Sequence, residues 1–172
     1  HDRATKMMAA IPTPQKGGKY LQYLTTEVVR FVIQTQHTEL AIKTDREPTM
    51  HALTDAVRRV CRSLNIKVHD ESVPVGDHQA NGAAEVTVQV LRQKADMWLQ
   101  QIEDQVAGGK TLFSSMHPIY GWALMHAGWT HNRFVVNSGQ TLYERAQDRC
   151  YSGKLCMFGE DVLGYLRVDK GG

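Results

Sequence analysis

The sequence predicts an α/β fold, in which helices pack against a sheet. Segments with apolar residues at helical spacing alternate along the chain with short apolar runs of strand length. The 172 residues are 42% hydrophobic and 22% charged, which is ordinary for one soluble domain with a core of its own. The sequence contains no apolar run long enough to span a membrane and nothing that resembles a signal peptide.

Four short segments are expected to form strands. The apolar run in "ATKMMAAIPTP" (4–14) is one, stopped by its two prolines. "ELAIKTD" (39–45) and "NIKVHD" (65–70) are the second and third, and "DVLGYLRV" (161–168) is the fourth. With the helices between them, they give the strand–helix alternation of an α/β domain.

Four helices are expected: one within 17–36, one that Thr49 caps, one over about 79–106 that ends at a Gly-Gly pair, and one over roughly 118–134. A mobile loop is expected at 71–79, which contains Pro and Gly and has no periodicity. The apolar residues that indicate the helices are, in chain order, Leu21, Leu24, Val28, Phe31 and Val32; Leu53, Val57, Val60, Cys61 and Leu64; Leu91, Ala95, Trp98, Leu99 and Ile102; and Trp122, Leu124, Met125 and Trp129.

The composition constrains function only weakly. Twenty basic against eighteen acidic residues give a net charge of +2, which is compatible with nucleic-acid binding but does not indicate it. The three scattered cysteines predict a reducing compartment without disulfides, and Cys150 and Cys156 lie too far apart for a zinc-binding CxxC pair. We expect an intracellular protein, nuclear or cytoplasmic and not secreted. Because the chain does not begin with Met, we expect it to be a fragment.

Two acidic residues occupy positions at which active sites are commonly found in α/β domains. Asp45 follows a predicted strand, and Glu85 begins the long predicted helix. Carboxylates of this kind hold Mg²⁺, and two such ions about 4 Å apart assist phosphoryl transfer. Asp45 can equally be a turn or cap aspartate, and Glu85 a favourable charge near a helix N-terminus, worth roughly 0.3–1 kcal/mol. Position in the sequence alone leaves these alternatives open.

The surrounding motifs resemble those of a known family. "LAIKTDREP" and "SVPVGDHQANGAAEVTVQVLRQK" resemble the second and third acidic motifs of retroelement integrases, which are DDE-type polynucleotidyl transferases. In that family a strand ends in Thr/Ser-Asp, and Gln-x-Asn-Gly-x-x-Glu begins a helix. The matching residues here are Thr44, Asp45, Gln79, Asn81, Gly82 and Glu85. The forty positions between the two acids (85 − 45) are slightly more than is usual in the family.

The likeness extends over nearly the whole chain. "HDRATKMMAAIPTP" resembles the turn and third strand of the family, and "GWALMHAGWTHNRF" resembles a later helix with its typical Asn-Arg. "TLYERAQDRCYSGKLCMFGEDVLGY" resembles the "TPYE … FGE" tail of retrotransposon integrases, with Leu142 in place of Pro. Val86 follows the glutamate where a basic residue is common.

The resemblance implies an RNase H-like fold, here lacking its first two strands. It implies a partial catalytic core over 1–136 and a C-terminal extension over 137–172, both from a retrotransposon polyprotein. The expected cofactor is Mg²⁺ or Mn²⁺, the expected partners are element-end and target DNA, and a homo-oligomer is expected. In the family, metal-activated water nicks the 3′ end of the element DNA, and the freed hydroxyl attacks target DNA.

Site residues follow from the same resemblance. Asp45 and Glu85 would be catalytic metal ligands, and Asn81 with Gly82 would shape the loop–helix junction, although turn chemistry explains that pair equally. Gln89 and Arg92 lie on roughly the helical face of Glu85 and would meet phosphate or bases; the alternative is a solvated polar stripe. Lys43 is a further candidate contact to phosphate, and Lys94 a weaker one.

The family uses three acids, and the first is not evident here. The only early acid, Asp2, matches a turn aspartate of the family, so we expect the first ligand to be absent and catalysis by this chain alone to be weak or absent. A second hypothesis is a catalytically inactive remnant that binds nucleic acid or a protein. A third is an unrelated α/β phosphoesterase that hydrolyses small phosphate esters.

Overall fold

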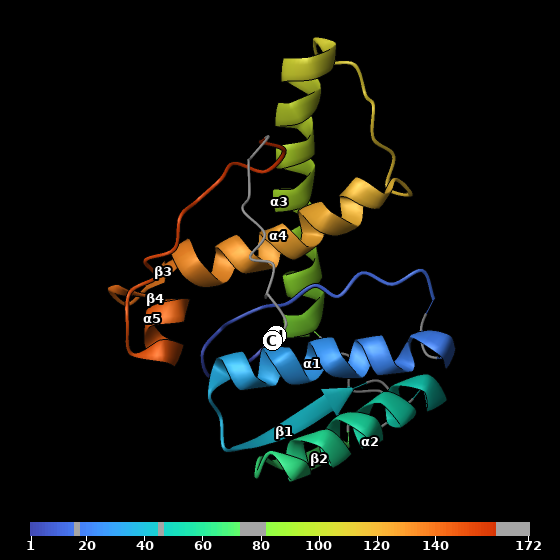
Figure 1. Cartoon of the computed structure of the whole chain (residues 1–172), viewed down its shortest axis with the longest axis vertical. Coiled ribbons are helices and arrows are strands. Elements are labelled where there is room, and N and C mark those ends of the chain that lie inside the picture. Colours follow the sequence, from blue (N-terminus) through green and yellow to red (C-terminus); the bar gives the residue numbers. More distant parts are fainter. Residues whose placement is uncertain (16–17, 45–46, 73–81, 161–172) are drawn as a thin grey trace, which may run out of the picture.

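The protein is a mixed α/β chain whose computed structural model describes residues 1–15, 18–44, 47–72 and 82–160 (Figure 1). In chain order the elements are the 3₁₀ turn η1 (Gly18–Tyr20), α1 (Leu21–Thr35), β1 (Glu39–Thr44), α2 (Pro48–Ser63), β2 (Lys67–Ser72), α3 (Gly82–Ala107), α4 (Pro118–Phe134), β3 (Val136–Asn137), β4 (Gln140–Thr141) and α5 (Leu142–Gln147). The predicted helices and the strands at 39–45 and 65–70 are confirmed. The strand expected at 161–168 and residues 73–79 of the expected loop lie outside the described residues.

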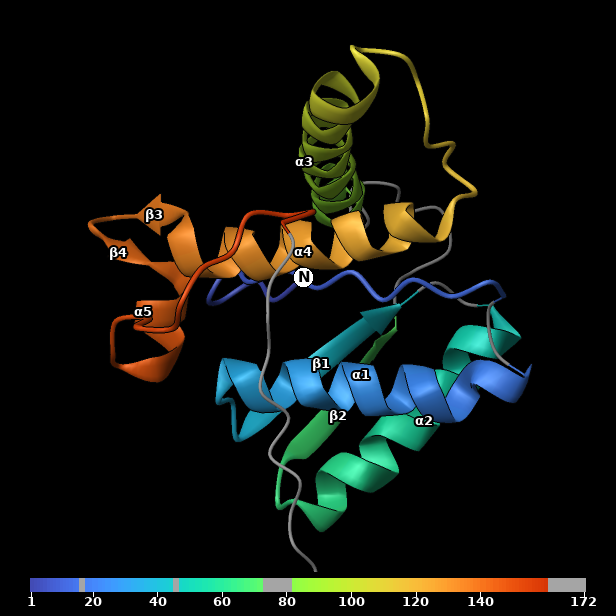
Figure 2. The same cartoon turned by 45° about the horizontal axis from the view of Figure 1, so that its top comes forward.

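The first half of the chain is a β–α–β unit with one further helix. β1 and β2 pair in parallel, in register from Glu39 opposite Lys67 to Thr44 opposite Ser72. Helices α1 and α2 lie side by side against one face of this pair (Figure 2). The core there consists of buried residues from both helices with partly buried residues of both strands and Ile66, which precedes β2: Val29, Val32, Val57, Cys61, Leu40, Ile42, Ile66 and Val68.

The opposite face of the strand pair is polar. Parallel strands are usually covered on both faces and are apolar throughout. Here Glu39 contacts both Lys67 (3.9 Å) and His69 (2.8 Å) across the strands, and Lys43 lies 3.9 Å from Glu71. The strands therefore alternate between a core-facing and a solvent-facing side chain, as in a sheet covered on one face only.

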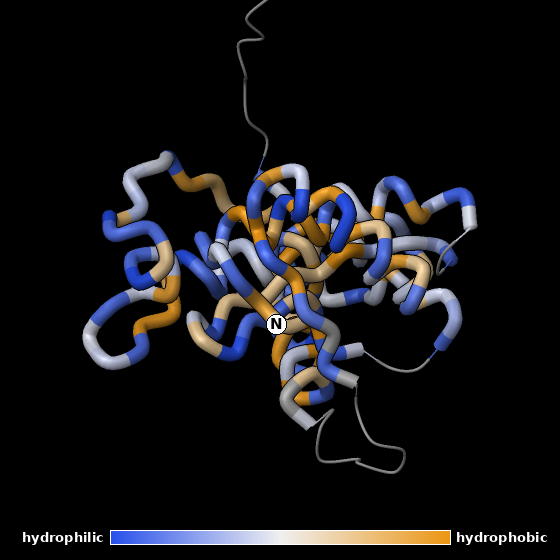
Figure 3. Tube along the Cα trace, turned by 90° about the horizontal axis from the view of Figure 1, so that it is seen from below, coloured by the Kyte–Doolittle hydropathy of each residue, from blue (hydrophilic) through white to orange (hydrophobic). Residues whose placement is uncertain are grey.

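The second half is built on the long helix α3, which α4 crosses (Figure 1). Ala95 and Leu99 of α3 pack against Ala123 of α4, with aromatic residues around them. The connection between the helices is held by Glu103, whose buried carboxylate accepts the backbone N–H groups of Leu112 (2.7 Å) and Phe113 (2.9 Å). Figure 3 shows many of the hydrophobic segments gathered toward the middle of the molecule.

The N-terminal segment is not the strand expected at 4–14. Its backbone pairs with a side chain instead, because Asn132 of α4 accepts the N–H of Met8 and donates to its carbonyl, both at 2.8 Å. No strand lies beside it among the described residues, so no ladder can form. Met7 then packs against Leu142 and Ala146 of α5, which joins part of the 137–172 extension to the rest of the chain.

Two further expectations are wrong in detail. Thr49 does not cap α2: Pro48 occupies the first helical position, and the preceding Glu47 is the cap residue. Trp122 is not a core residue, because it is 68% exposed, while the buried residues of α4 are Ala123, Ala127, Gly128, His131 and Asn132. None of the helices in the described part of the chain is both long and apolar enough to cross a membrane.

Candidate functional site

A groove lies between the C-terminal end of β1 and the first half of α3. Its volume is about 630 Å³. In Figure 1 the arrowhead of β1 lies below the lower end of α3, where that helix begins. The residues that line the groove are Lys43, Thr44, Met50, Ala84, Glu85, Val88, Gln89, Arg92, Gln93 and Asp96. Four residues predicted from the sequence, Lys43, Glu85, Gln89 and Arg92, are thus brought together.

One face of α3 supplies most of the polar groups. Residues three, four, seven, eight and eleven positions apart on a helix lie on one side of it, which places Gln89, Arg92, Gln93 and Asp96 along the groove after Glu85. Glu85 lies in the first turn, where the unpaired backbone N–H groups favour a negative charge. Its side chain is exposed, so it is accessible to a ligand in the groove.

The groove has cations at both walls. Lys43 of β1 is 20% exposed and lies 3.9 Å from Glu71, which leaves its ammonium at the rim. Arg92 lines the groove from α3, one helical turn before Asp96, and lies near Tyr120 of α4. Burial raises the pKa of the Tyr120 hydroxyl, and the neighbouring Asp96 carboxylate, to which Tyr120 is hydrogen-bonded, raises it further. The Tyr120 hydroxyl thus stays protonated, and its hydrogen bond holds Asp96 at the end of the groove away from Glu85.

The metal ligands can be located only in part. Asp45 and Asn81 lie outside the described residues, although Thr44 and Gly82, their neighbours in sequence, border the groove or begin α3. Within the described ranges no three His, Cys, Asp or Glu side chains gather closely enough to hold an ion. Asp96 cannot share an ion with Glu85, because eleven residues of helix separate them by about 16 Å. Of the described carboxylates in the groove, Glu85 is therefore the candidate ligand for a hard cation.

Gly82 is the first residue of α3, and its backbone does not require glycine. Its φ is not in the left-handed region, and a Cβ atom added there would meet no atom of the described residues within 4 Å. The expected shaping of the loop–helix junction by Asn81 and Gly82 is thus not explained by crowding or strain at Gly82.

Sequence reasoning missed Met50, Gln93 and Asp96 as groove residues. Extending the helical spacing from Glu85 would have found the last two, whereas Met50 comes from α2 and has no such signal. Lys94, the weaker candidate, is not among the groove residues. It lies near the buried His131 of α4, where it and the burial of the ring lower the histidine pKa.

Asp2 is fully engaged in a turn. Its carboxylate accepts the backbone N–H of Thr5 at 2.8 Å and the Thr5 hydroxyl, and His37 Nε2 lies 3.0 Å away. Burial opposes its ionisation, but these hydrogen bonds and the nearby His37 offset that effect, so the carboxyl pKa is lowered. This geometry is that of a turn aspartate, as expected from the sequence.

Arg133 of the expected Asn-Arg pair fixes the C-terminal part of α4. Its guanidinium lies over the rings of Trp129 (4.4 Å), Tyr151 (5.0 Å) and Tyr143 (5.4 Å) and donates to the Trp129 carbonyl at 3.2 Å. Because these rings belong both to α4 and to the extension after it, Arg133 joins the two. It acts in the scaffold and does not line the groove.

The tail motifs also have structural roles. Thr141 and Glu144 form a reciprocal capping box at the start of α5, with Glu144 N–H donating to the Thr141 hydroxyl (3.1 Å) and Thr141 N–H to the Glu144 carboxylate (2.6 Å). Phe158 packs beside Trp98 and begins a turn in which Gly159 has a φ of +85°. The positive φ favours glycine, and a Cβ on Gly159 would approach Ile102 Cδ1 to 2.7 Å, so the tip of that side chain would have to shift.

Comparison with known proteins does not assign the chain to a family: no family model, curated protein or solved structure matches it.

Proposed function

We propose that this chain is the catalytic-core region of a retroelement integrase with an RNase H-like fold, and that the groove between β1 and α3 binds DNA beside a divalent metal ion. The observation that carries the proposal is the convergence of Lys43, Glu85 and Arg92 in one groove. The resemblance selected Glu85, Arg92 was chosen because it lies on the same helical face, and Lys43 comes from a strand far earlier in the sequence. Element-end and target DNA are the proposed partners, in a homo-oligomeric assembly.

In the proposed site some residues would bind the metal ion and others would bind the DNA phosphates. Asp45 and Glu85 would hold Mg²⁺ or Mn²⁺, which supplies Lewis-acid activation of an attacking oxygen when bound. Arg92 and Lys43, one from each wall, would neutralise backbone phosphates, and Gln89 between them and Glu85 would hydrogen-bond to phosphate or to a base edge. A DNA strand lying along the groove would then meet the cations after passing the metal.

The metal part of the proposal is tested by Mn²⁺ titration calorimetry on the 172-residue chain. Glu85→Gln and Asp45→Asn are each expected to weaken binding by about tenfold or more, because each removes one anionic oxygen donor. Asp96→Asn is the matched control, since it removes a groove carboxylate on the same helix but too far away to share the ion. Equal affinity of the wild type and Glu85→Gln contradicts the proposed metal site.

The DNA part is tested by fluorescence anisotropy with a labelled duplex at several salt concentrations. Arg92→Ala is expected to weaken binding and to reduce the slope of log affinity against log salt by about one, the value for one lost phosphate contact. Arg149→Ala, an exposed cation beyond α5, serves as the control. A slope that is the same for Arg92→Ala and the wild type would place the DNA elsewhere.

A second candidate is a DNA-binding module without catalysis. It is favoured by the groove itself, to which the described residues contribute two cations but only Glu85 at the metal end. Both candidates predict the effect of Arg92→Ala on binding, and strand transfer separates them. We expect weak or absent strand transfer by this chain alone; robust Mn²⁺-dependent joining that Glu85→Gln abolishes would establish the enzyme and refute that expectation.

A further inference from the structure

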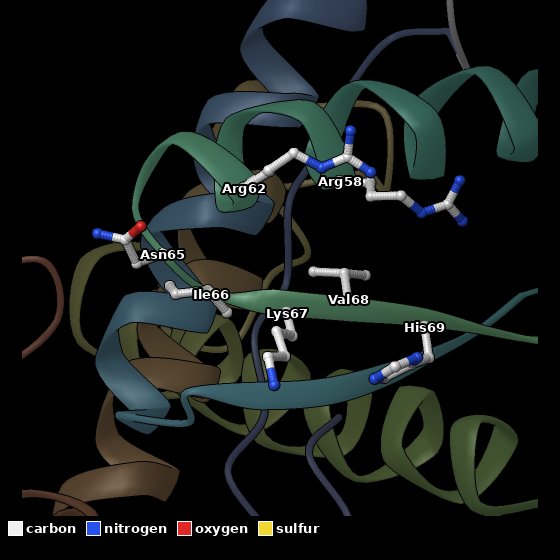
Figure 4. A pocket seen from close by; sticks show the side chains of 7 residues that line it. All are labelled: Arg58, Arg62, Asn65, Ile66, Lys67, Val68 and His69. Atoms are coloured by element: carbon white, nitrogen blue, oxygen red, sulfur yellow. The ribbon is translucent and has the colours of Figure 1, made fainter.

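A second groove runs along the outer edge of β2, the edge that faces away from β1. Its volume is about 500 Å³, and it shares no residue with the groove between β1 and α3. Figure 4 shows Arg58 and Arg62 of α2 on one side of the strand, and Lys67 and His69 of β2 on the other, with Val68 directed toward α2. Because side chains from both faces of β2 line it, this groove follows the edge of the strand.

The backbone of this edge is available for pairing. Lys67 donates its N–H to the Thr38 carbonyl on the β1 side at 2.9 Å. Backbone groups alternate in direction along a strand, so the N–H and C=O of Val68 point toward the outer edge. Among the described residues β2 pairs with β1 alone, and an edge of this kind is a template for a further strand.

The charges around the groove are arranged in two rows. Arg58 and Arg62 are one helical turn apart on α2, and Lys67 and His69 are two residues apart on the opposite face of β2. Among the described residues that line the groove, none is acidic.

The acidic residues that contact the cations of this groove are not among the residues that line it. Asp55 contacts Arg58 at 3.0 Å, and the exposed Glu39 contacts Lys67 and His69. Solvent-exposed pairs of this kind contribute little to stability, so a ligand's carboxylates can replace them at small cost.

We propose that an extended, acidic peptide segment of a partner protein binds in this groove by adding as a third strand to the edge of β2. A strand sends its side chains alternately to the two faces with a repeat of about 6.7 Å, which matches the spacing within both rows of cations. Its backbone pairs with Val68 while its carboxylates meet Arg62 on one face and Lys67 on the other. A nucleic-acid strand has neither the backbone ladder nor two rows of charge on opposite faces of one chain.

The test uses the full 172-residue chain and a short fluorescein-labelled peptide of Glu and Thr with acids on both faces of the extended chain. Two control peptides separate the contributions: one carries Gln in place of Glu, and the other has prolines that remove backbone donors without changing the charge. The variant is the double change Arg62→Glu with Lys67→Glu. Arg59→Glu is the matched control, because it reverses one charge on the same helix at an exposed position that does not line the groove.

We expect the acidic peptide to bind, the double variant to weaken binding at least tenfold, and both control peptides to bind at least tenfold less well. Arg59→Glu should change the affinity less than twofold. Equal binding of the proline peptide would show attraction by charge alone and overturn strand addition. Failure of the acidic peptide to bind, or loss of duplex DNA binding in the double variant without loss of peptide binding, would also overturn the proposal.

Discussion

Removing the side chain of Asn132 is expected to release the N-terminal segment from α4. Asn132 is 3% exposed, and its amide makes two hydrogen bonds of 2.8 Å with the backbone of Met8. In Asn132→Ala both Met8 groups lose their partners, and each unsatisfied group costs about 1–3 kcal/mol when buried. Because water reaches part of this region, we expect a total loss of about 2–4 kcal/mol in the free energy of unfolding. For a chain of this size, that corresponds to a fall in Tm of about 5–15 °C.

Asn132→Asp distinguishes hydrogen bonding from packing. Aspartate has nearly the same shape and still accepts the Met8 N–H, but its ionised form cannot donate to the Met8 carbonyl and places a negative charge against it. The variant should therefore be destabilised at neutral pH, and its deficit relative to the wild type should shrink in acid, where the carboxyl can donate.

The assay is thermal unfolding followed by far-UV circular dichroism, with the exposed Gln105→Ala in α3 as the control. An Asn132→Ala protein that melts within about 1 °C of the wild type, or an Asn132→Asp deficit that does not depend on pH, would show that the Met8–Asn132 contact does not hold the N-terminal segment.

Three further predictions concern single residues, each measured by thermal unfolding. Gly159→Ala should cost at least about 1–2 kcal/mol, because it combines a positive φ with a close contact; an unchanged Tm would contradict the turn geometry. Gly82→Ala should leave stability unchanged or raise it by up to about 1 kcal/mol, since it is unhindered at a helix start; a large loss would reveal a constraint on the junction. The pKa of His131 lies below its ordinary 6.5 because of burial and, secondarily, Lys94, so the unfolded chain binds the proton first. Stability should thus be complete above about pH 7 and decline toward about pH 5, less steeply in His131→Gln; equal slopes would contradict this assignment.

The sequence predicted the elements whose signals are local. The bounds of α4 match because Pro118 suits the first turn and a helical pattern follows it. The sequence did not predict which face of α4 is buried. Trp122 points outward, while Ala123 and Ala127 are inside, because α4 lies close to α3 and to the N-terminal backbone. A Cβ on Gly128 would already lie 3.3 Å from the Met8 carbonyl. Where two segments cross this closely, a residue is buried because it is small, and its hydrophobicity does not decide the matter.

The strand prediction for the N-terminal segment was wrong for a different reason. An extended apolar segment becomes a strand only where a neighbouring strand can form backbone hydrogen bonds with it, and the sequence of the segment does not contain that information.

For the site, helical spacing placed Gln89 and Arg92 correctly on the face of Glu85. Periodicity along one helix, however, does not indicate which strand lies opposite that face. Lys43 and Thr44 line the groove with Glu85, and helical periodicity gave no sign of this approach.

The residues that carry the resemblance divide into two physical classes. Asn132, Arg133, the Thr141–Glu144 capping box and Gly159 hold the scaffold, and none of them lines the groove. Leu142 illustrates how such motifs tolerate change. It stands at the first position of α5, where the fixed φ of proline is favourable, but as leucine it is 1% exposed and packs against Met7. Leucine at this position thus contributes buried apolar surface where a proline would contribute a preset backbone. Scaffold motifs of this kind can persist without chemistry, so any catalysis would depend on Asp45 and Glu85.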